Sequence, residues 1–367
     1  MIGLARANPT LLVDMDTLEV LYAEDAGLPW HPASVTKLMT AYVAFEEIAR
    51  GTITLDTPVV LSRHAVGQAP SKSGLPVDSA LSMKDALYVM MIKSANDVAM
   101  AIAETIGGTE AGFVVKMNDA ASRMGLTATY FANPNGLDDP AQRMSARDMA
   151  VLSLYIRQSF PQYDPMFSTP AVQLGTKRLE SENKLLTKFA GTTGMKTGFV
   201  CASGLNLVAT VERGGRRLLA VVLGAASARD RNERAAELVL RGLSGSAGGT
   251  GQTVLNVPNN PGVEPFNMRP QICGKQAAEY VKAQEAAFPM GLKGQPSYLT
   301  DLVETAPYQA TNLGRIRSNI ALPRPRPLHV PLFPQAPVEV TAEAVLRPSL
   351  SIDAGVPVPR PRPSFYN

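Results

Sequence analysis

The chain of 367 residues is long enough for one large domain or two smaller ones, and its 45% hydrophobic and 18% charged residues are typical of a globular protein. A formal net charge of +3, with no basic patch interleaved with aromatic residues, argues against nucleic-acid binding. No run of about 18 apolar residues occurs, so the sequence predicts no transmembrane helix. The two cysteines form no CxxC pair and the three histidines are scattered, so no metal site is expected.

The first 245 residues alternate between short strands and helices. Strands are expected at 11–14 and 20–22, and helical periodicity then predicts helices at 34–48, 83–106, 111–124 and 146–158. Apolar strands at 205–211 and 217–223 flank a hairpin signal at 213–215, and a last helix is expected at 229–241. Strands at both ends with helices between them predict a mixed α/β fold, in which an antiparallel sheet is closed by the termini of the domain and covered by helices.

The sequence changes character after residue 245, which divides the chain into an expected catalytic domain, 1–245, and a C-terminal region, 246–367. A glycine- and serine-rich linker at 244–251 opens this region, which holds most of the 29 prolines. A short helical island is expected at 275–287. Proline–arginine repeats at 323–327 and 359–363 cannot form a helix, so the rest of the region is expected to be an extended, largely disordered tail.

The first candidate site is the run Ser34-Val35-Thr36-Lys37 at the start of an expected helix. Residues three apart share one helix face, so the Lys37 amine can lie against the Ser34 hydroxyl. A buried amine can lose its proton and activate the serine, because desolvation lowers the pKa of a lysine. Ser34 at a helix start also places backbone N–H groups near developing negative charge. Taken alone, the pattern also fits a helix cap followed by a surface lysine.

Two further motifs follow along the chain. Ser94-Ala95-Asn96 interrupts an apolar helical pattern with polar groups, which fits either a polar turn between helices or a site facing Lys37. Lys196-Thr197-Gly198, followed by Phe199, offers a strand whose glycine lets a peptide substrate approach closely. Ser-x-x-Lys, Ser-x-Asn and Lys-Thr-Gly in this order, separated by about 60 and then about 100 residues, match the motif set of penicillin-binding proteins and class A β-lactamases.

On these motifs the chain resembles the low-molecular-mass penicillin-binding proteins of the D-alanyl-D-alanine carboxypeptidase family, over about residues 8 to 243. The likeness extends to the segments 113–118, 133–137, 182–186 and 194–199. Class A β-lactamases usually carry Asp in the middle of the second motif and a Glu-x-x-Leu-Asn loop, whereas this chain has Ala95 and no such loop. The resemblance implies a β-lactamase/transpeptidase-like fold, with the site between an antiparallel sheet and a helical region.

The resemblance implies a serine enzyme that removes the terminal D-alanine from peptidoglycan stem pentapeptides, with β-lactams as covalent inhibitors and without a metal or other cofactor. Ser34 would be the nucleophile, Lys37 its base, and Ser94 the relay that passes a proton to the leaving amine. The backbone N–H groups of Ser34 and Phe199 would form the oxyanion hole. The expected substrate-binding residues are Asn96, Lys196, Thr197, Gly198, Phe199 and, by family resemblance, Arg231.

Two other classes of function stay open. A β-lactamase or a cross-link endopeptidase could use the same fold, and a non-catalytic wall-binding protein could recruit a partner through the tail. A non-catalytic role is disfavoured because the chain keeps all four motif residues that carry the chemistry, namely Ser34, Lys37, Ser94 and Lys196. The family also implies export to the periplasm or cell surface, although residues 1–7 are too short for the apolar region of a signal peptide. The proline-rich end predicts no amphipathic helix, so membrane anchoring in the family's usual way is not expected.

Cys201 lies three residues beyond Gly198, and Cys273 follows the glycine-rich linker. An even cysteine count in an exported chain predicts a disulfide between them, and the alternative is two unrelated thiols.

Overall fold

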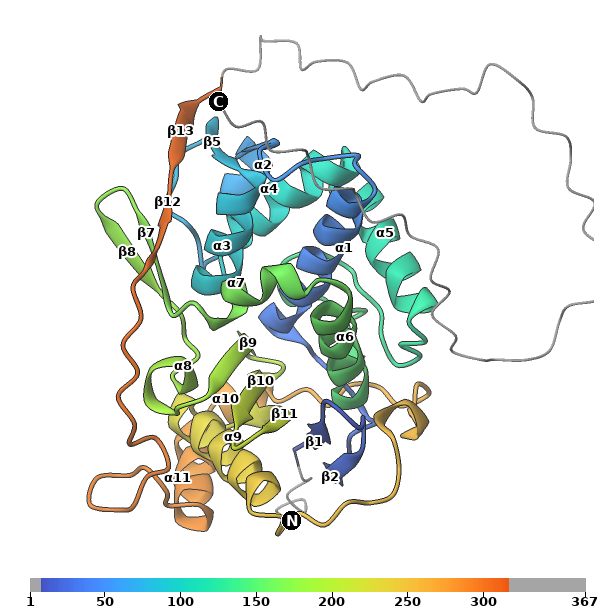
Figure 1. The fold of residues 1–367 in the computed structure, drawn as a ribbon, viewed down its shortest axis with the longest axis vertical. Coiled ribbons are helices and arrows are strands. Elements are labelled where there is room, and N and C mark those ends of the chain that lie inside the picture. Colours follow the sequence, from blue (N-terminus) through green and yellow to red (C-terminus); the bar gives the residue numbers. More distant parts are fainter. Residues whose placement is uncertain (1–7, 317–367) are drawn as a thin grey trace, which may run out of the picture. The chain divides into compact units, whose positions relative to one another are not determined.

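A five-stranded antiparallel sheet and a group of helices build the fold in this computed structural model, which describes residues 8–316 (Figure 1). The strands are β1 (Thr10–Asp14), β2 (Val20–Glu24), β3 (Pro29–Trp30), β4 (Pro58–Val60), β5 (Ser79–Ser82), β6 (Met144–Ser145), β7 (Ala171–Leu174), β8 (Lys177–Glu180), β9 (Thr192–Val200), β10 (Gly204–Arg213), β11 (Arg216–Ala225), β12 (Tyr308–Ala310) and β13 (Asn312–Arg315). The α-helices are α1 (Lys37–Ala49), α2 (Arg63–Val66), α3 (Met83–Lys93), α4 (Asn96–Gly107), α5 (Glu110–Arg123), α6 (Ala146–Ser159), α7 (Asp164–Ser168), α8 (Leu185–Lys188), α9 (Ala228–Leu243), α10 (Arg269–Ile272) and α11 (Ala277–Ala287). Three 3-10 turns are η1 (Ala33–Thr36), η2 (Pro161–Tyr163) and η3 (Val254–Asn256).

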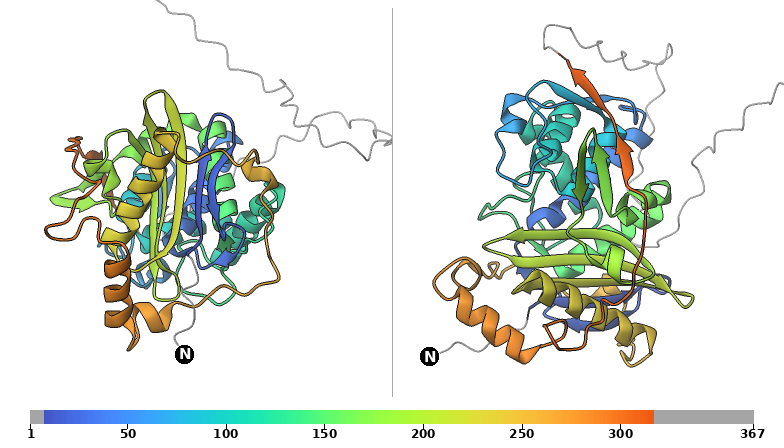
Figure 2. Two further views of the ribbon diagram at one scale, coloured as in Figure 1. Left: turned by 90° about the horizontal axis from the view of Figure 1, so that it is seen from below. Right: turned by 90° about the vertical axis from the view of Figure 1, so that its left-hand side faces the viewer.

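The main sheet has the strand order β2-β1-β11-β10-β9, so strands from both ends of the expected domain lie next to each other. Alternate residues of these strands face opposite sides, as the period of two requires. Leu12, Leu218 and Ala220 pack against α9, whereas Leu219 and Val221 face the helices on the other side. Figure 2 shows α9 on one face of the sheet and the larger group of helices on the other. The predicted mixed α/β fold with an antiparallel sheet closed by its termini is confirmed.

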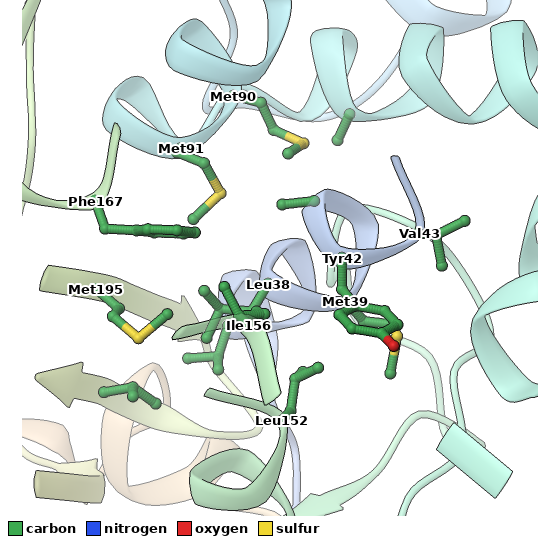
Figure 3. Packing of buried hydrophobic residues seen from close by; sticks show 14 of the residues in the cluster. Leu38, Met39, Tyr42, Val43, Met90, Met91, Leu152, Ile156, Phe167 and Met195 are labelled. Carbon is green, nitrogen blue, oxygen red and sulfur yellow. The ribbon is translucent and has the colours of Figure 1, made fainter. Parts of the chain in front are cut away.

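Helix α1 is buried along most of its length in the centre of the helical group. Figure 3 shows its apolar side chains between Met90 and Met91 of α3 and Leu152 and Ile156 of α6. The first turn of this helix is therefore held on several sides by packed side chains, which resist displacement because protein interiors are close-packed. This packing fixes the start of α1, where the first candidate motif lies.

The single helix predicted at 83–106 is wrong, because the chain breaks between α3 and α4. Ser94 ends α3 in the left-handed conformation, with φ 61° and ψ 35°, and Ala95 is extended. The apolar spacing continues on both sides of the break, so periodicity alone does not reveal it. The break turns the second candidate motif out of the helix pattern and toward the sheet.

Residues 246–316 are ordered against the rest of the chain, whereas composition predicted mostly disordered chain there. The linker pairs with β2, since Val20 N donates to Gln252 O and Thr250 N donates to Val20 O. The expected helical island is present as α11. The chain then runs along one side of the molecule, where β12 pairs with β7 and β13 pairs with β5 (Figure 1).

The boundary expected at 245/246 therefore does not separate two compact units within residues 8–316. Local composition could not show this, because the C-terminal segment is held by strand edges distant in sequence. The proline–arginine repeats at 323–327 and 359–363 lie outside the described residues.

Among residues 8–316, no single helix is both long and apolar enough to cross a membrane, and only the bent pair of α4 and α5, with 86° between them, has the required length and composition together. The same residues contain no group of three or more His, Cys, Asp or Glu side chains arranged to hold a metal ion.

Candidate active site

Ser34 lies in the 3-10 turn η1, and Lys37 is the first residue of α1. The Lys37 side chain is fully buried, and its Nζ donates hydrogen bonds to Ser34 Oγ at 2.8 Å, Asn96 Oδ1 at 2.7 Å and the Asn135 backbone O at 2.5 Å. No carboxylate is among these three acceptors. The spacing of three residues thus brings the amine against the hydroxyl, as the sequence predicted, although through a 3-10 turn rather than an α-helix.

The surroundings of Lys37 favour its neutral form. Burial lowers the pKa of Lys37 well below its usual range, the positive charge of Lys196 lowers it further, and the carboxylate of Asp97 opposes the shift. A neutral amine at 2.8 Å from a hydroxyl can accept its proton. The arrangement is therefore that of an activated nucleophile and its base.

The second motif contacts both lysines of the site. Ser94 Oγ accepts a hydrogen bond from Lys196 Nζ at 2.9 Å, whereas Asn96 Oδ1 accepts from Lys37. The amide group of Asn96 is oriented by its Nδ2, which donates to Ala69 O at 2.8 Å. The left-handed Ser94 allows these two side chains to reach different partners, because a helical backbone would keep both in one turn.

Asp97 holds the loop on which Asn96 depends. Its buried carboxylate accepts hydrogen bonds from the Ser73 backbone N at 3.0 Å and from Ser73 Oγ at 2.7 Å. The same loop supplies Ser71 O, which accepts from Asn96 N at 2.7 Å. Sequence reasoning assigned no role to Asp97, whose only signal is an acidic residue in the first turn of α4.

The third motif lies on β9, the edge strand of the main sheet. Lys196 and Thr197 are buried, and the side chain of Phe199 is 51% exposed. A Cβ on Gly198 would lie 2.8 Å from Pro32 O and 3.1 Å from Ser34 N, so a side chain there would displace the turn that carries Ser34. Glycine at this position lets the edge of β9 approach the serine.

Two positively charged side chains lie close to each other here, Lys196 in the middle of β9 and Arg231 on α9. Burial, and to a smaller extent the positive charge of Arg231, lower the pKa of Lys196 to about 7, although the carboxylate of Glu182 opposes the shift. Arg231 is buried as well, and its guanidinium donates to Glu182 O at 2.8 Å. Two buried cations side by side favour an anion between them, and a carboxylate fits this requirement.

The loop at 133–137 supplies a ligand of Lys37 that sequence reasoning missed. The ligand is the backbone oxygen of Asn135. Every residue has such an oxygen, so the residue type does not indicate that it binds Lys37. Gly136 has φ +83°, and a Cβ there would lie 1.9 Å from Ala33 O. The available signals were the turn-forming pair Asn135-Gly136 and the family likeness of the segment 133–137, and neither marks a ligand of Lys37.

Cys201 and Cys273 are joined by a disulfide in the structure, with their Cα atoms 5.6 Å apart and a sequence separation of 72. Cys201 follows β9 directly, and Cys273 follows α10. The bridge fastens the segment around α10 beside the candidate site.

We expect the denatured, unreduced protein to contain no free thiol, and reduction to lower its stability. Closing a loop of this length is worth on the order of 4 kcal/mol in the chain-entropy model. Thiol titration in denaturant gives the count, and thermal melts with and without reductant give the stability. Two titratable thiols in the unreduced protein would exclude the bridge.

The sequence profile of the D-alanyl-D-alanine carboxypeptidase family, peptidase S11, matches residues 4–227. Over 240 residues the chain is 36% identical to the D-alanyl-D-alanine carboxypeptidase DacD of Escherichia coli K12, a match that covers 64% of this chain and 62% of DacD. Penicillin binding protein 6B from Escherichia coli is similar in structure, with a TM-score of 0.62, 35% identity, and coverage of 65% of this chain and 77% of that protein.

A further similar structure is penicillin-binding protein D2 from Listeria monocytogenes in its cefotaxime-bound form, with a TM-score of 0.57, 29% identity, and coverage of 65% of this chain and 97% of that protein. This chain spans about three fifths of the length of the curated relatives that it matches. All three motifs lie inside the matched residues 4–227, whereas Arg231 and Cys273 lie beyond them. The chain belongs to the D-alanyl-D-alanine carboxypeptidase family.

Proposed function

We propose that this chain is a serine-type D-alanyl-D-alanine carboxypeptidase, which removes the terminal D-alanine from peptidoglycan stem pentapeptides through an acyl-enzyme on Ser34. The observation that carries the proposal is the 2.8 Å contact between Ser34 and a fully buried Lys37 with a lowered pKa. A lysine with this burial can serve as the general base for a serine nucleophile.

In the acylation step, Ser34 Oγ attacks the carbonyl carbon of the penultimate D-alanine while Lys37 takes the hydroxyl proton. The backbone N–H groups of Ser34 and Phe199 stabilise the oxyanion. The peptide C–N bond then breaks, and the proton that Lys37 took from Ser34 passes through Ser94 to the nitrogen of the departing D-alanine, which leaves Lys37 neutral again. Water hydrolyses the resulting ester, which releases the shortened peptide and restores Ser34.

The substrate is held by its terminal carboxylate and its backbone. Lys196 and Thr197 bind the carboxylate, and the buried Arg231 supports the positive charge there. Asn96 orients the substrate and Lys37. Because Gly198 has no side chain, the peptide can lie along the edge of β9 close to Ser34.

The dependence of kcat/KM on pH should be bell-shaped. On the acid side kcat/KM falls as Lys37 becomes protonated, because a charged ammonium cannot accept the serine proton. On the basic side it falls as pH rises above about 7, where Lys196 loses the charge that binds the carboxylate. In Lys196→Arg the basic limb should move to higher pH, since arginine stays charged. If the basic limb of this variant stayed at the same pH, Lys196 would not be the group that binds the carboxylate.

The assay that separates the candidate functions compares three substrates with the same purified protein. We expect free D-alanine from a pentapeptide, little cleavage of a cross-linked peptide dimer, and slow turnover of penicillin. Fast penicillin hydrolysis without D-alanine release would favour a β-lactamase, and preferred cleavage of the dimer would favour an endopeptidase. No turnover of any substrate would favour a non-catalytic wall-binding protein.

We also propose that β-lactams acylate Ser34, and that the protein works in the bacterial cell envelope, in the periplasm where one exists. A related penicillin-binding protein has been solved in a cefotaxime-bound form, which supports the first statement. The substrate class supports the second, since stem peptides are part of the wall.

A further inference from the structure

A pocket of about 340 Å³ lies beside the candidate active site. His31 lines it, three residues before Ser34 along the chain, and so does Asp138, which follows the loop that binds Lys37. Ala202, just beyond the end of β9, lines it as well. All three segments that form the pocket's inner wall therefore continue directly from the site.

The outer wall comes from residues 264–269, which lie beyond the matched family residues 4–227. This wall is held firmly in place. Met268 is buried, its N donates to Ala202 O at 2.9 Å, and the ring of Phe266 lies 6.1 Å from that of Trp30. The bridge from Cys201 to Cys273 fastens the same segment. The pocket is therefore built into this chain before any substrate binds.

The charges of the pocket favour a cation. Arg269 forms an ion pair with Asp138, so the negative charge of Asp138 is already balanced. Glu264 also lines the pocket, and among residues 8–316 it has no ion-pair partner. Burial lowers the pKa of His31, so at neutral pH the ring adds no positive charge. The carboxylate of Glu264 is therefore the one charge among the pocket's lining residues that no opposite charge within residues 8–316 balances.

The direction of a bound peptide leads from Ser34 to this pocket. In the proposed function the terminal carboxylate lies near Lys196 and the scissile carbonyl lies near Ser34, and Gly198 leaves the edge of β9 open beside that serine. A peptide in this position runs antiparallel to β9, so its earlier residues extend toward Val200 and Ala202. Each extended residue advances the chain by about 3.3 Å, so the long side chain of the residue just before the two D-alanines can reach the pocket.

We propose that this pocket is a subsite for a cationic side chain, namely an amine carried by the residue immediately before the two D-alanines. Glu264 receives the ammonium group, and the ion pair of Asp138 and Arg269 forms the polar floor. The inference rests on the proposed function for the placement of the peptide. It adds a specificity determinant from a segment outside the matched family residues.

The experiment compares two peptides that differ in one charge. Nα-acetyl-L-lysyl-D-alanyl-D-alanine keeps its side-chain amine, and the Nα,Nε-diacetyl peptide does not. We expect the charged peptide to bind the Ser34→Ala variant, and to be cleaved by the intact protein, about three- to fivefold better, as for a partly exposed ion pair. This preference should disappear in Glu264→Gln and persist in the control Glu304→Gln, which changes an exposed glutamate outside the pocket.

Binding and cleavage answer different questions. Equal binding of the two peptides, or a preference that survives Glu264→Gln, would overturn the subsite whether or not D-alanine is released. Absence of D-alanine release from both peptides, with the binding preference intact, would overturn the proposed function and leave the subsite standing. The preference should also shrink as salt is added, because exposed charge pairs are screened.

Discussion

Replacing Ser34 with alanine is expected to abolish both covalent labelling by penicillin and release of D-alanine, with the fold intact. The change removes the nucleophile, and losses of this kind reach about 10⁴-fold or more in serine hydrolases. Stability should change by only about 1 kcal/mol, because Lys37 keeps its hydrogen bonds to Asn96 and Asn135.

Mass spectrometry of the intact protein after incubation with penicillin measures the labelling, and a thermal melt measures the fold. Ser122→Ala on the exposed face of α5 is the matched control and should behave as the parent protein. Labelling that persists on another serine of the Ser34→Ala variant would remove Ser34 from the mechanism.

The Lys37→Arg variant is expected to be nearly as inactive as Lys37→Ala. Arginine keeps the positive charge but does not give up its proton, so it cannot accept one from Ser34. Loss of a general base costs about 10²- to 10⁴-fold in rate. D-alanine release by both variants, measured beside the parent protein, gives the comparison.

A second measurement separates the chemical role of Lys37 from its structural one. Lys37 is fully buried, so the alanine variant has space where the amine stood. A small primary amine added to Lys37→Ala should restore part of the activity, and this activity, taken relative to that of the parent protein at the same pH, should grow as pH rises and more of the free amine is neutral. High activity of Lys37→Arg without added amine would mean that the lysine acts only through its charge.

The sequence predicted the parts of the site that depend on local spacing. A serine and a lysine three residues apart lie together on any helical turn, and the contact forms even though the turn is 3-10. The sheet was predicted for a similar reason, since alternating apolar strands at both ends of a domain have one simple way to pair. The hairpin of β10 and β11 joins through the expected Gly214-Gly215 turn.

The missing parts depend on contacts between segments far apart in sequence. The break at Ser94 needs a left-handed residue, which the apolar spacing around it conceals. The carbonyl of Asn135 is a main-chain atom, so residue type does not mark it. Residues 246–316 are ordered partly because β12 pairs with the edge of β7 and β13 pairs with the edge of β5. Local composition cannot reveal such pairing.

The turn that carries the serine is enclosed on two sides by glycines, Gly136 and Gly198, whose missing side chains leave room only for the backbone of residues 32–34. If β-lactams acylate Ser34, as proposed, this close fit limits the ways in which resistance to them can arise. A substitution at either glycine that hindered a β-lactam would also push Ser34 out of place and damage the enzyme's own reaction. Mutational escape from such drugs should therefore arise at positions away from this turn.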